Sequence, residues 1–414
     1  MRTALIPALF IITLTGLARA AEEPPVEWID PDTGHRVVRL SSEPRTSSLY
    51  FHQNAYSRDG SRIIATTSDG GIATINIATR EIKKIVPGRV MVLVTGRKTG
   101  DVYYTRRAER GAEATVYAAN LDTGVERKIT TIPGNVNLGS LNCDETLLLG
   151  TRIPGPPAPR PPPNASGRPD LRANLAIARS GPPRELVTIS TATGDIKVVH
   201  TEREWTNHIQ FSPTDPNQIL FCHEGPWHEV DRLWTVRADG TGLTKIHTRT
   251  MTMEIAGHEF FSGDGKTIWY DLQTPRGEDF WVAGYEIATG KRTWYHMERD
   301  NWSVHFNVSP DGKLFAGDGF DEKGVSRATN GHWIWLFRPE LVPDRAVDKS
   351  ALADNLITPG VFKAERLVNM SKHNYRLEPN LTFSPDMKWI IFRSNMHGAT
   401  QVYAVEIAKS ETAK

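Results

Sequence analysis

The chain has 414 residues, with 49 lysines and arginines against 48 aspartates and glutamates, and a net charge of +1. This balance excludes a basic surface that would bind nucleic acid through overall charge, and it excludes an acidic disordered chain. The 33 glycines, 27 prolines and 11 tryptophans, with 39% hydrophobic residues, are typical of a β-rich protein with many turns rather than a helical bundle.

The first twenty residues have the features of a secretory signal peptide. Arg2 precedes the apolar stretch Ala4–Leu17, and small residues follow at Ala18-Arg19-Ala20. No later stretch reaches the roughly 20 apolar residues that a membrane-spanning helix requires. We therefore expect residues 1–20 to be removed, and the mature protein to be periplasmic or secreted without a transmembrane segment.

One short pattern recurs along the chain and predicts repeated β-hairpins. It consists of a few alternating residues, a Ser-Pro-Asp-Gly turn or a relative of it, and then a β-rich run. The turns begin at Ser57, Thr95, Asn142, Ser212, Ser262, Ser309 and Ser384, about 40 to 75 residues apart. Asp-Gly and Thr-Gly pairs supply the positive φ angles that tight hairpin turns require. Repeats of this length predict the four-stranded blades of a β-propeller.

Seven instances of the pattern predict an all-β, single-domain, seven-bladed β-propeller over residues 21–414. Two longer intervals predict insertions near residues 152–185 and 320–372. The first insertion contains the proline-rich stretch 154–163, which cannot form a strand ladder because proline lacks the amide donor. This stretch is either a solvated loop or a rim that shapes a cleft.

Polar residues gather where the innermost strand of each predicted blade approaches the turn. This is the part of a propeller that faces the central channel, where ligands bind. The residues are His52, Asn207-His208, Gly257-His258-Glu259, His305 and Glu378-Pro379-Asn380, with His223-Glu224, Asp318-Gly319 and Arg393-Ser394-Asn395 at neighbouring strand ends. A purely structural residue would repeat as the same type in every blade. The variation between blades therefore favours a site assembled once from several blades.

Four of these residues suit a divalent cation. His258, His305, Glu378 and Asn380 offer imidazole, carboxylate and amide oxygen, a mixture suited to Mn²⁺ or Mg²⁺, with Ca²⁺ as a further option. Zinc is disfavoured, because the set has no thiolate and no compact group of three histidines.

Two arginines suit an anionic substrate. The guanidinium groups of Arg232 and Arg393 can each make a two-point contact with a carboxylate. The alternative for either residue is an ion pair with a neighbouring blade, for Arg232 with Asp231 or Glu229.

Several other classes of chemistry lack their motifs. The sequence has no Gly-x-Ser-x-Gly elbow followed by a hydrolase domain, no phosphate-cradling Gly-x-x-x-x-Gly-Lys-Ser/Thr loop and no His-Glu-x-x-His. The two cysteines, Cys143 and Cys222, fall in different repeats, so their pairing stays open.

The sequence resembles the oligogalacturonate lyases over the mature chain. The segments that carry the resemblance are His223-Glu224-Gly225-Pro226-Trp227-His228, Gly257-His258-Glu259-Phe260, His305-Phe306-Asn307 through Asp311-Gly312 to Gly317-Asp318-Gly319, and Phe383-Ser384-Pro385-Asp386 with Phe392-Arg393-Ser394-Asn395. The family's enzymes are seven-bladed propellers that cleave short oligogalacturonides by metal-assisted β-elimination to 4,5-unsaturated uronates. The resemblance implies the same fold and activity here.

The resemblance also implies roles for individual residues. His258 matches the base that removes the proton, Arg232 matches the arginine that meets the substrate carboxylate, and His305 matches one metal ligand. The family's other ligands come from a Gln-x-x-His-x-His stretch. Here it reads Tyr375-Arg376-Leu377-Glu378-Pro379-Asn380, so Tyr375, Glu378 and Asn380 stand at the ligand positions.

We expect the substrate to be contacted by a wider set of residues, namely His52, His223, His228, Arg393 and Asn395. His223, His228 and Tyr375 are the candidates for the proton donor. The expected partner is an oligouronide, with Mn²⁺ as the expected metal and no nucleic acid. Two alternatives stay open: a lyase for another uronate, and a non-catalytic exported propeller similar to TolB-type binding domains.

Overall fold

Strands dominate the structure, a computed structural model that describes residues 23–155, 161–163, 169–342 and 356–409. Within these ranges α1 (Leu171–Ser180) is the one α-helix, and no helix is long and apolar enough to cross a membrane. The predicted signal peptide lies outside the described residues, as does the middle of the proline-rich stretch. Helix α1 belongs to the insertion predicted near residues 152–185.

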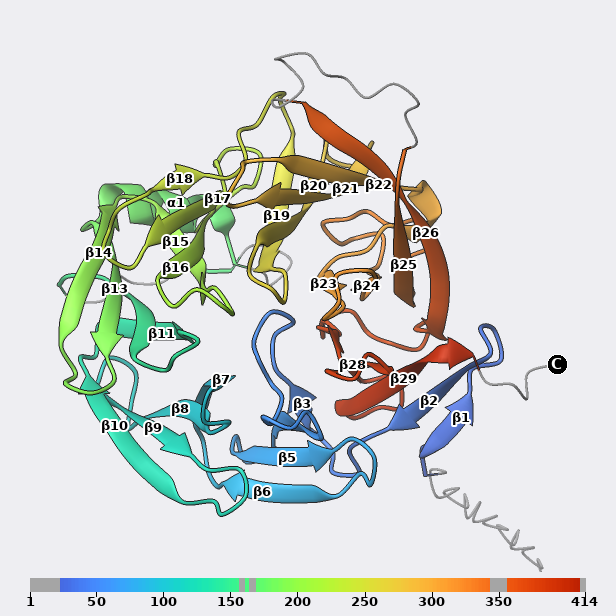
Figure 1. The fold of residues 1–414 in the computed structure, drawn as a ribbon, viewed down its shortest axis with the longest axis horizontal. Helices are drawn as coiled ribbons and strands as arrows, with labels where there is room; N and C mark the ends of the chain where they lie inside the picture. The colour runs from blue at the N-terminus through green and yellow to red at the C-terminus, as the bar shows by residue number, and fades with distance from the viewer. Residues whose placement is uncertain (1–22, 156–160, 164–168, 343–355, 410–414) are drawn as a thin grey trace, which may run out of the picture.

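From β3 to β18 the ring repeats one unit, an antiparallel sheet of sequential strands (Figure 1). Four of the sheets contain four strands each. They are formed by β3 (Ser47–Ser48), β4 (Arg62–Thr66), β5 (Ile72–Asn76) and β6 (Ile82–Val86); by β7 (Met91–Thr95), β8 (Val102–Arg107), β9 (Ala114–Ala119) and β10 (Glu126–Ile132); by β11 (Val136–Leu141), β12 (Leu147–Arg152), β13 (Arg184–Ser190) and β14 (Ile196–Glu202); and by β15 (Trp205–Phe211), β16 (Gln218–Glu224), β17 (Leu233–Arg237) and β18 (Thr244–Lys245).

The fifth sheet has eight strands and joins two four-stranded groups. One group is β19 (Ile255–Phe261), β20 (Thr267–Gln273), β21 (Phe280–Glu286) and β22 (Arg292–Met297); the other is β23 (Asn307–Val308), β24 (Phe315–Gly317), β25 (Trp333–Leu341) and β26 (Ile357–Asn369). The short 3-10 helix η1 (Arg299–Asn301) connects them. Strand β26 has 13 residues, and its first part pairs in parallel with β22. The sequence pattern predicts two separate blades here, but this pairing makes one continuous sheet, so the described residues form six sheets.

The sixth sheet closes the ring by combining both ends of the described chain. Its order is β1 (Glu27–Ile29), β2 (His35–Arg39), β29 (Gln401–Lys409), β28 (Trp389–Ser394) and β27 (Thr382–Phe383). Val37 of β2 stands opposite Val405 of β29 in the antiparallel ladder. The ring therefore closes through main-chain hydrogen bonds between segments more than 360 residues apart.

The repeated turn forms for a local reason. At Ser309-Pro310-Asp311-Gly312, the Ser309 hydroxyl donates to Asp311 Oδ1 at 2.7 Å and accepts from the Leu314 amide at 2.9 Å. Gly312 has a φ of 73°, which a side chain would disfavour. The same serine-to-aspartate bond occurs at Ser57, Ser262 and Ser384. The pattern found in the sequence is thus a set of self-contained hydrogen-bonded turns.

The hydrophobic core lies between neighbouring sheets. One of its clusters joins Ile64 and Ile72 of the first sheet to Tyr104 and Ala119 of the next. Other clusters repeat this arrangement around the ring. The thiols of Cys143 and Cys222 are both free. Because each sheet is buried on two faces by its neighbours, the ends of the innermost strands are left to carry polar groups.

The closing sheet provides a test of the fold. Replacing Ile390, which is 0% exposed in β28, by alanine removes buried methyl groups and leaves a cavity. We expect Ile390→Ala to lower the free energy of unfolding by about 2–5 kcal/mol. The matched control is Ile29→Ala in β1 of the same sheet, where the side chain is 39% exposed and little loss is expected. Equal losses in urea unfolding would contradict the packing described.

Candidate active site

Four polar residues occupy one backbone position that recurs in successive parts of the ring. His208, His258, His305 and Asn380 each lie four residues before the serine of a repeated turn. Each has a positive φ, of 46°, 49°, 45° and 50° respectively. The register of the inner strand shifts at His208 and at His258, as expected of a β-bulge. Left-handed backbone at a residue with a side chain costs about 1–3 kcal/mol, and such positions cluster at functional sites.

His258 is held by an aspartate on the neighbouring strand. Its Nδ1 lies 2.9 Å from Oδ2 of Asp271, which is 3% exposed. The Trp227 ring packs edge-on against the imidazole at 5.1 Å. Gly257 permits this contact, because a Cβ at that position would lie 2.3 Å from the indole. In the neutral ring, an Nδ1 proton donated to Asp271 leaves the lone pair on Nε2.

His305 is built in the same way, thirteen residues before its own aspartate. Its Nδ1 lies 2.8 Å from Asp318 Oδ2, and its Nε2 lies 3.7 Å from Glu378 Oε2. Burial opposes the charged ring, but the carboxylates of Asp318 and Glu378 outweigh it and raise the pKa of His305. The His258 and His305 rings lie 4.5 Å apart between centroids. Two carboxylate-backed imidazoles therefore stand side by side.

A buried chain of charges lies beside this pair. Arg232 is 3% exposed and donates to Glu224 at 2.8 Å and to Glu259 at 3.2 Å. Its guanidinium lies 4.3 Å from the Trp227 ring centroid. Burial opposes the charge, yet both carboxylates act with other neighbours to raise the pKa of Arg232 well above its usual value. Arg232 is thus ion-paired, although with Glu224 and Glu259 rather than with Asp231 or Glu229.

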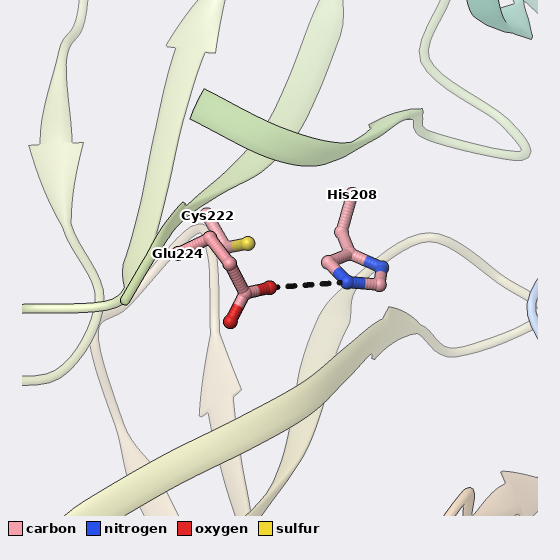
Figure 2. A group of neighbouring side chains, drawn as sticks. All are labelled: His208, Cys222 and Glu224. Atoms are coloured by element: carbon pink, nitrogen blue, oxygen red, sulfur yellow. Dashed lines mark ion pairs between the residues drawn. The ribbon is translucent and has the colours of Figure 1, made fainter. Parts of the chain in front are cut away.

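His208 ends this chain of charges. Its Nε2 lies 3.4 Å from Glu224 Oε2, and Figure 2 shows the two side chains facing each other with Cys222 beside them. Among the described residues, His208, Cys222 and Glu224 are the group of three whose potential ligand atoms all lie within 4.8 Å. Burial raises the pKa of the Cys222 thiol well above its usual value, so the thiol is neutral. The nearby Arg232 also opposes a cation, and the group is better described as a hydrogen-bonded support.

Glu224, His258 and His305 line a cleft of about 740 Å³. Its polar lining combines His258, His305 and Glu378 with Glu224 and His228, and its apolar lining includes Trp205, Trp227 and Phe320. The start of α1 forms part of the wall, at Asp170 to Arg172. The volume suits a small organic ligand, and the mixture of aromatic rings with a few polar groups is typical of a binding site.

The predicted metal ligands divide into two pairs. His305 and Glu378 approach each other in the cleft. The Tyr375 hydroxyl instead donates to the carbonyls of Asp318 and Gly331 at 3.4 and 3.3 Å, and Asn380 Oδ1 accepts from the Phe51 amide. As ligands, Tyr375 and Asn380 therefore stay predictions.

The predicted substrate-binding residues also separate. His228 lines the cleft, and His52 lies against Tyr50 and His208, where burial and His208 lower its pKa to about 3. His223 points to the opposite face of β16 from Glu224 and binds Glu202 at 2.8 Å. Successive side chains of a strand point to opposite faces, which explains the difference.

Arg393 and Asn395 make local contacts near the closing sheet. Arg393 donates to the Glu378 carbonyl at 2.7 Å and to Ser47 and Ser48 of the first sheet. The Asn395 amide donates to the carbonyl of Asn374. Arg393 thereby holds the backbone of Glu378 in place.

Sequence reasoning missed Tyr50, whose ring lies 5.0 Å from His52, 5.8 Å from His208 and 5.7 Å from His305. Burial and the nearby carboxylates of Glu378 and Glu259 raise the pKa of its hydroxyl well above the usual value. The hydroxyl therefore stays protonated among the imidazoles. The available signal was its position, two residues before His52.

The fold and the cleft together define a propeller enzyme whose centre is a pair of aspartate-backed imidazoles. Comparison with known proteins gives its family. The sequence model of oligogalacturonate lyase matches residues 178–411, more than half of the chain. The chain belongs to the oligogalacturonate lyase family, and it is therefore a polysaccharide lyase, as the sequence resemblance predicted.

Individual proteins agree with this assignment. The chain is 22% identical over 405 residues to an oligogalacturonide lyase of Pectobacterium atrosepticum, covering 92% of this chain and 95% of the relative. A solved oligogalacturonate lyase in complex with manganese is similar in fold, with a TM-score of 0.74, 22% identity, and coverage of 94% of this chain and 96% of that one. The Cps50 (Swd1) β-propeller domain of Myceliophteria thermophila gives a TM-score of 0.51 at 9% identity, over 87% and 98% of the two chains. The all-β, propeller-like fold is thus confirmed.

The contact between His223 and Glu202 predicts a pH-dependent stability. Burial alone would raise the pKa of Glu202, but bonds from His200, His223 and Thr206 lower it from 4.5 to about 2. A carboxylate whose pKa is lowered by folding stabilises the protein above its unfolded pKa, and that stability disappears as pH falls from about 4.5 to about 2. Glu202→Gln should cost on the order of 3 kcal/mol at pH 7.

In urea unfolding, the loss of unfolding free energy caused by Glu202→Gln should become smaller as the pH falls from about 4.5 to about 2. The exposed Glu81 is the matched control, and Glu81→Gln should have little effect at any pH. A penalty for Glu202→Gln that does not change with pH would contradict the assignment.

Proposed function

We propose that this protein cleaves short oligogalacturonides, the fragments of pectin, by β-elimination, and that His258 is the base. The single observation that carries the proposal is the pair of imidazoles at His258 and His305, each fixed by a buried aspartate and both lining one cleft. The family assignment and the names of its similar relatives as oligogalacturonide lyases support the substrate class.

The residues account for the chemistry of the step. His258 Nε2 takes the proton from C5 of the uronide, the electron pair forms the C4–C5 double bond, and the bond between C4 and the glycosidic oxygen breaks. The departing oxygen takes up a proton, and no water is consumed. Of the three donors expected from the sequence, His228 lines the cleft, while His223 and Tyr375 bond elsewhere. Tyr50 is a further protonated group beside His305.

The donor set at His305 fits a divalent cation. Asp318 holds Nδ1 of His305, so that Nε2 can serve as a ligand, and Glu378 offers a carboxylate 3.7 Å away. His305 and Glu378 would hold the cation, and Mn²⁺ is our proposal because a similar structure is a manganese complex. When bound, such a cation stabilises the negative charge that develops on the uronate carboxylate.

We also propose a blade count, a cellular location and an alternative substrate for this protein. The eight-stranded sheet counts as two blades, β19–β22 and β23–β26, which gives a seven-bladed single domain over residues 21–414. The first twenty residues act as a signal peptide, so the mature enzyme works in the periplasm or outside the cell. Replacement of the two family histidines by Glu378 and Asn380 favours a second candidate function, in which the same elimination acts on another uronate.

Turnover tests the role of His258. Digalacturonate and trigalacturonate should produce the ultraviolet absorbance of an unsaturated uronate, and His258→Ala should lower kcat by about 10²- to 10⁴-fold in protein that remains folded. His397→Ala is the control, because His397 packs on Trp28 and Tyr403 at the closing sheet. Turnover of His258→Ala at the normal rate would remove it as the base, and a rise seen only with glucuronate oligomers would favour the second candidate.

Removal of a ligand tests the metal site. His305→Ala should weaken Mn²⁺ binding, measured by titration calorimetry on metal-free protein, by more than about tenfold. EDTA should abolish turnover of the unmodified protein. The His397→Ala protein should bind Mn²⁺ as the parent does, and unchanged Mn²⁺ affinity in His305→Ala would refute the site.

A further inference from the structure

One arginine lining the cleft has no side-chain partner among the described residues. The side chain of Arg276 makes no ion pair and no hydrogen bond to any described residue, and its Nε is buried without an acceptor. Burying a polar N–H without an acceptor is unfavourable, and more so if the group is charged. Water or a bound ligand supplies the acceptor for such a group in a folded protein.

A second arginine stands beside it. The charge of Arg327 acts directly on Arg276, and burial together with Arg327 lowers the pKa of Arg276. The Arg327 guanidinium lies over Gly277, where a Cβ would be 3.0 Å from its Nη1. Arg327 likewise makes no ion pair within the described part of the chain. Two neighbouring positive charges without a carboxylate favour the approach of an anion.

The other arginines near the cleft are already engaged. Arg172 pairs with Glu229, Arg232 with Glu224 and Glu259, and Arg393 with main-chain and hydroxyl oxygens of its neighbours. The two arginines that the sequence suggested for a substrate carboxylate are thus held by the protein itself. Arg276 has the free hydrogen-bonding capacity that this task requires.

Hydrogen bonds hold the main chain around Arg276, although the Arg276 side chain itself has no such bond to a described residue. Gln273 accepts from the Gly277 amide at 2.8 Å and donates to the Val325 carbonyl at 3.1 Å. Arg299 donates to the Gly277 carbonyl at 2.6 Å, and the Arg276 amide donates to the Met253 carbonyl at 2.9 Å. A guanidinium on a fixed backbone loses less freedom when it binds an anion.

Arg276 follows directly on the strand pair that carries the proposed base. Ile255 of β19 pairs with Gln273 of the antiparallel strand β20. His258 comes three residues after Ile255 and Arg276 three residues after Gln273, so they extend from this pair in opposite directions. Both side chains line the same cleft. Arg276 therefore stands apart from the base along the cleft, where a neighbouring sugar of an oligomer can present its carboxylate.

We propose that Arg276, flanked by Arg327, is a subsite for a second uronate carboxylate, on a sugar next along the oligomer from the one that reacts. This inference rests on the proposed function and extends it, because it requires a substrate with at least two acidic sugars. The planar fork of arginine matches the two oxygens of a carboxylate. An esterified carboxyl group, which carries no charge, would lose this contact.

Binding without turnover tests the subsite. In a His258→Ala background, titration calorimetry should show that Arg276→Gln weakens trigalacturonate binding by about 10- to 100-fold. Binding of the fully methyl-esterified trimer should barely change. Arg276→Lys keeps the positive charge but loses the planar guanidinium, so its affinity for trigalacturonate should lie between that of the parent and that of Arg276→Gln. Arg89→Gln, at an exposed arginine on the loop between β6 and β7, is the matched control and should bind as the parent does.

The outcomes separate this inference from the proposed activity. Arg276-dependent binding without any unsaturated product would support the subsite and overturn the lyase proposal. Product formation with a KM for the acidic trimer that is unaffected by both Arg276→Gln and Arg276→Lys would overturn the subsite and leave the lyase proposal intact. Failure of the parent to bind the acidic trimer at all would also overturn the subsite.

Discussion

Closure of the ring is the constraint on which the rest of the molecule depends. The main-chain pairing of β2 with β29 brings the first sheet against the last, so that Phe51 near the start of the chain donates its amide to Asn380 near the end. Arg393 spans the same seam to Ser47 and Ser48. Tyr50 reaches the imidazole of His305 only because this seam is closed. The candidate site is therefore a product of the whole ring rather than of one sheet.

Within the ring, buried charge is balanced by pairing rather than by solvent. Arg232 neutralises part of the charge on Glu224 and Glu259, and it lies against the indole that also packs on His258. Removing one member of such a network leaves an uncompensated charge in a dry environment, which is costly. The network thus links the stability of the fold to the position of the base.

The sequence predicted the features that are local and periodic. Repeated Ser-Pro-Asp-Gly turns revealed the hairpins because each turn is hydrogen-bonded within itself, as at Ser309 and Asp311. The placement of His258 and His305 in one cleft followed from their equivalent positions in neighbouring repeats. The sequence does not show which distant strands pair with each other, and so the pairing of β22 with β26 was not predicted.

The partners of the side chains in the candidate site could not be predicted from the sequence either. His223 and Glu224 are adjacent in the sequence, yet one binds Glu202 and the other faces the cleft. Which arginine is satisfied and which is not depends on contacts between separate repeats, as with Glu259 for Arg232. Short-range patterns carry no information about such pairs.

The pairing of β22 with β26 affects how the imidazoles of His258 and His305 are held relative to each other. His258 lies in β19 and His305 lies two residues before β23, and this pairing makes the two strand groups that begin there into one continuous sheet. Trp227 and the start of α1 line the same cleft from other parts of the ring. The cleft therefore has one wall on this continuous sheet and another wall on separate parts of the ring, which are joined to it by contacts such as the ion pair between Arg232 and Glu259. The main-chain ladder between β22 and β26 therefore helps to fix the spacing of the two imidazoles, while the opposite wall of the cleft comes from strands outside this ladder.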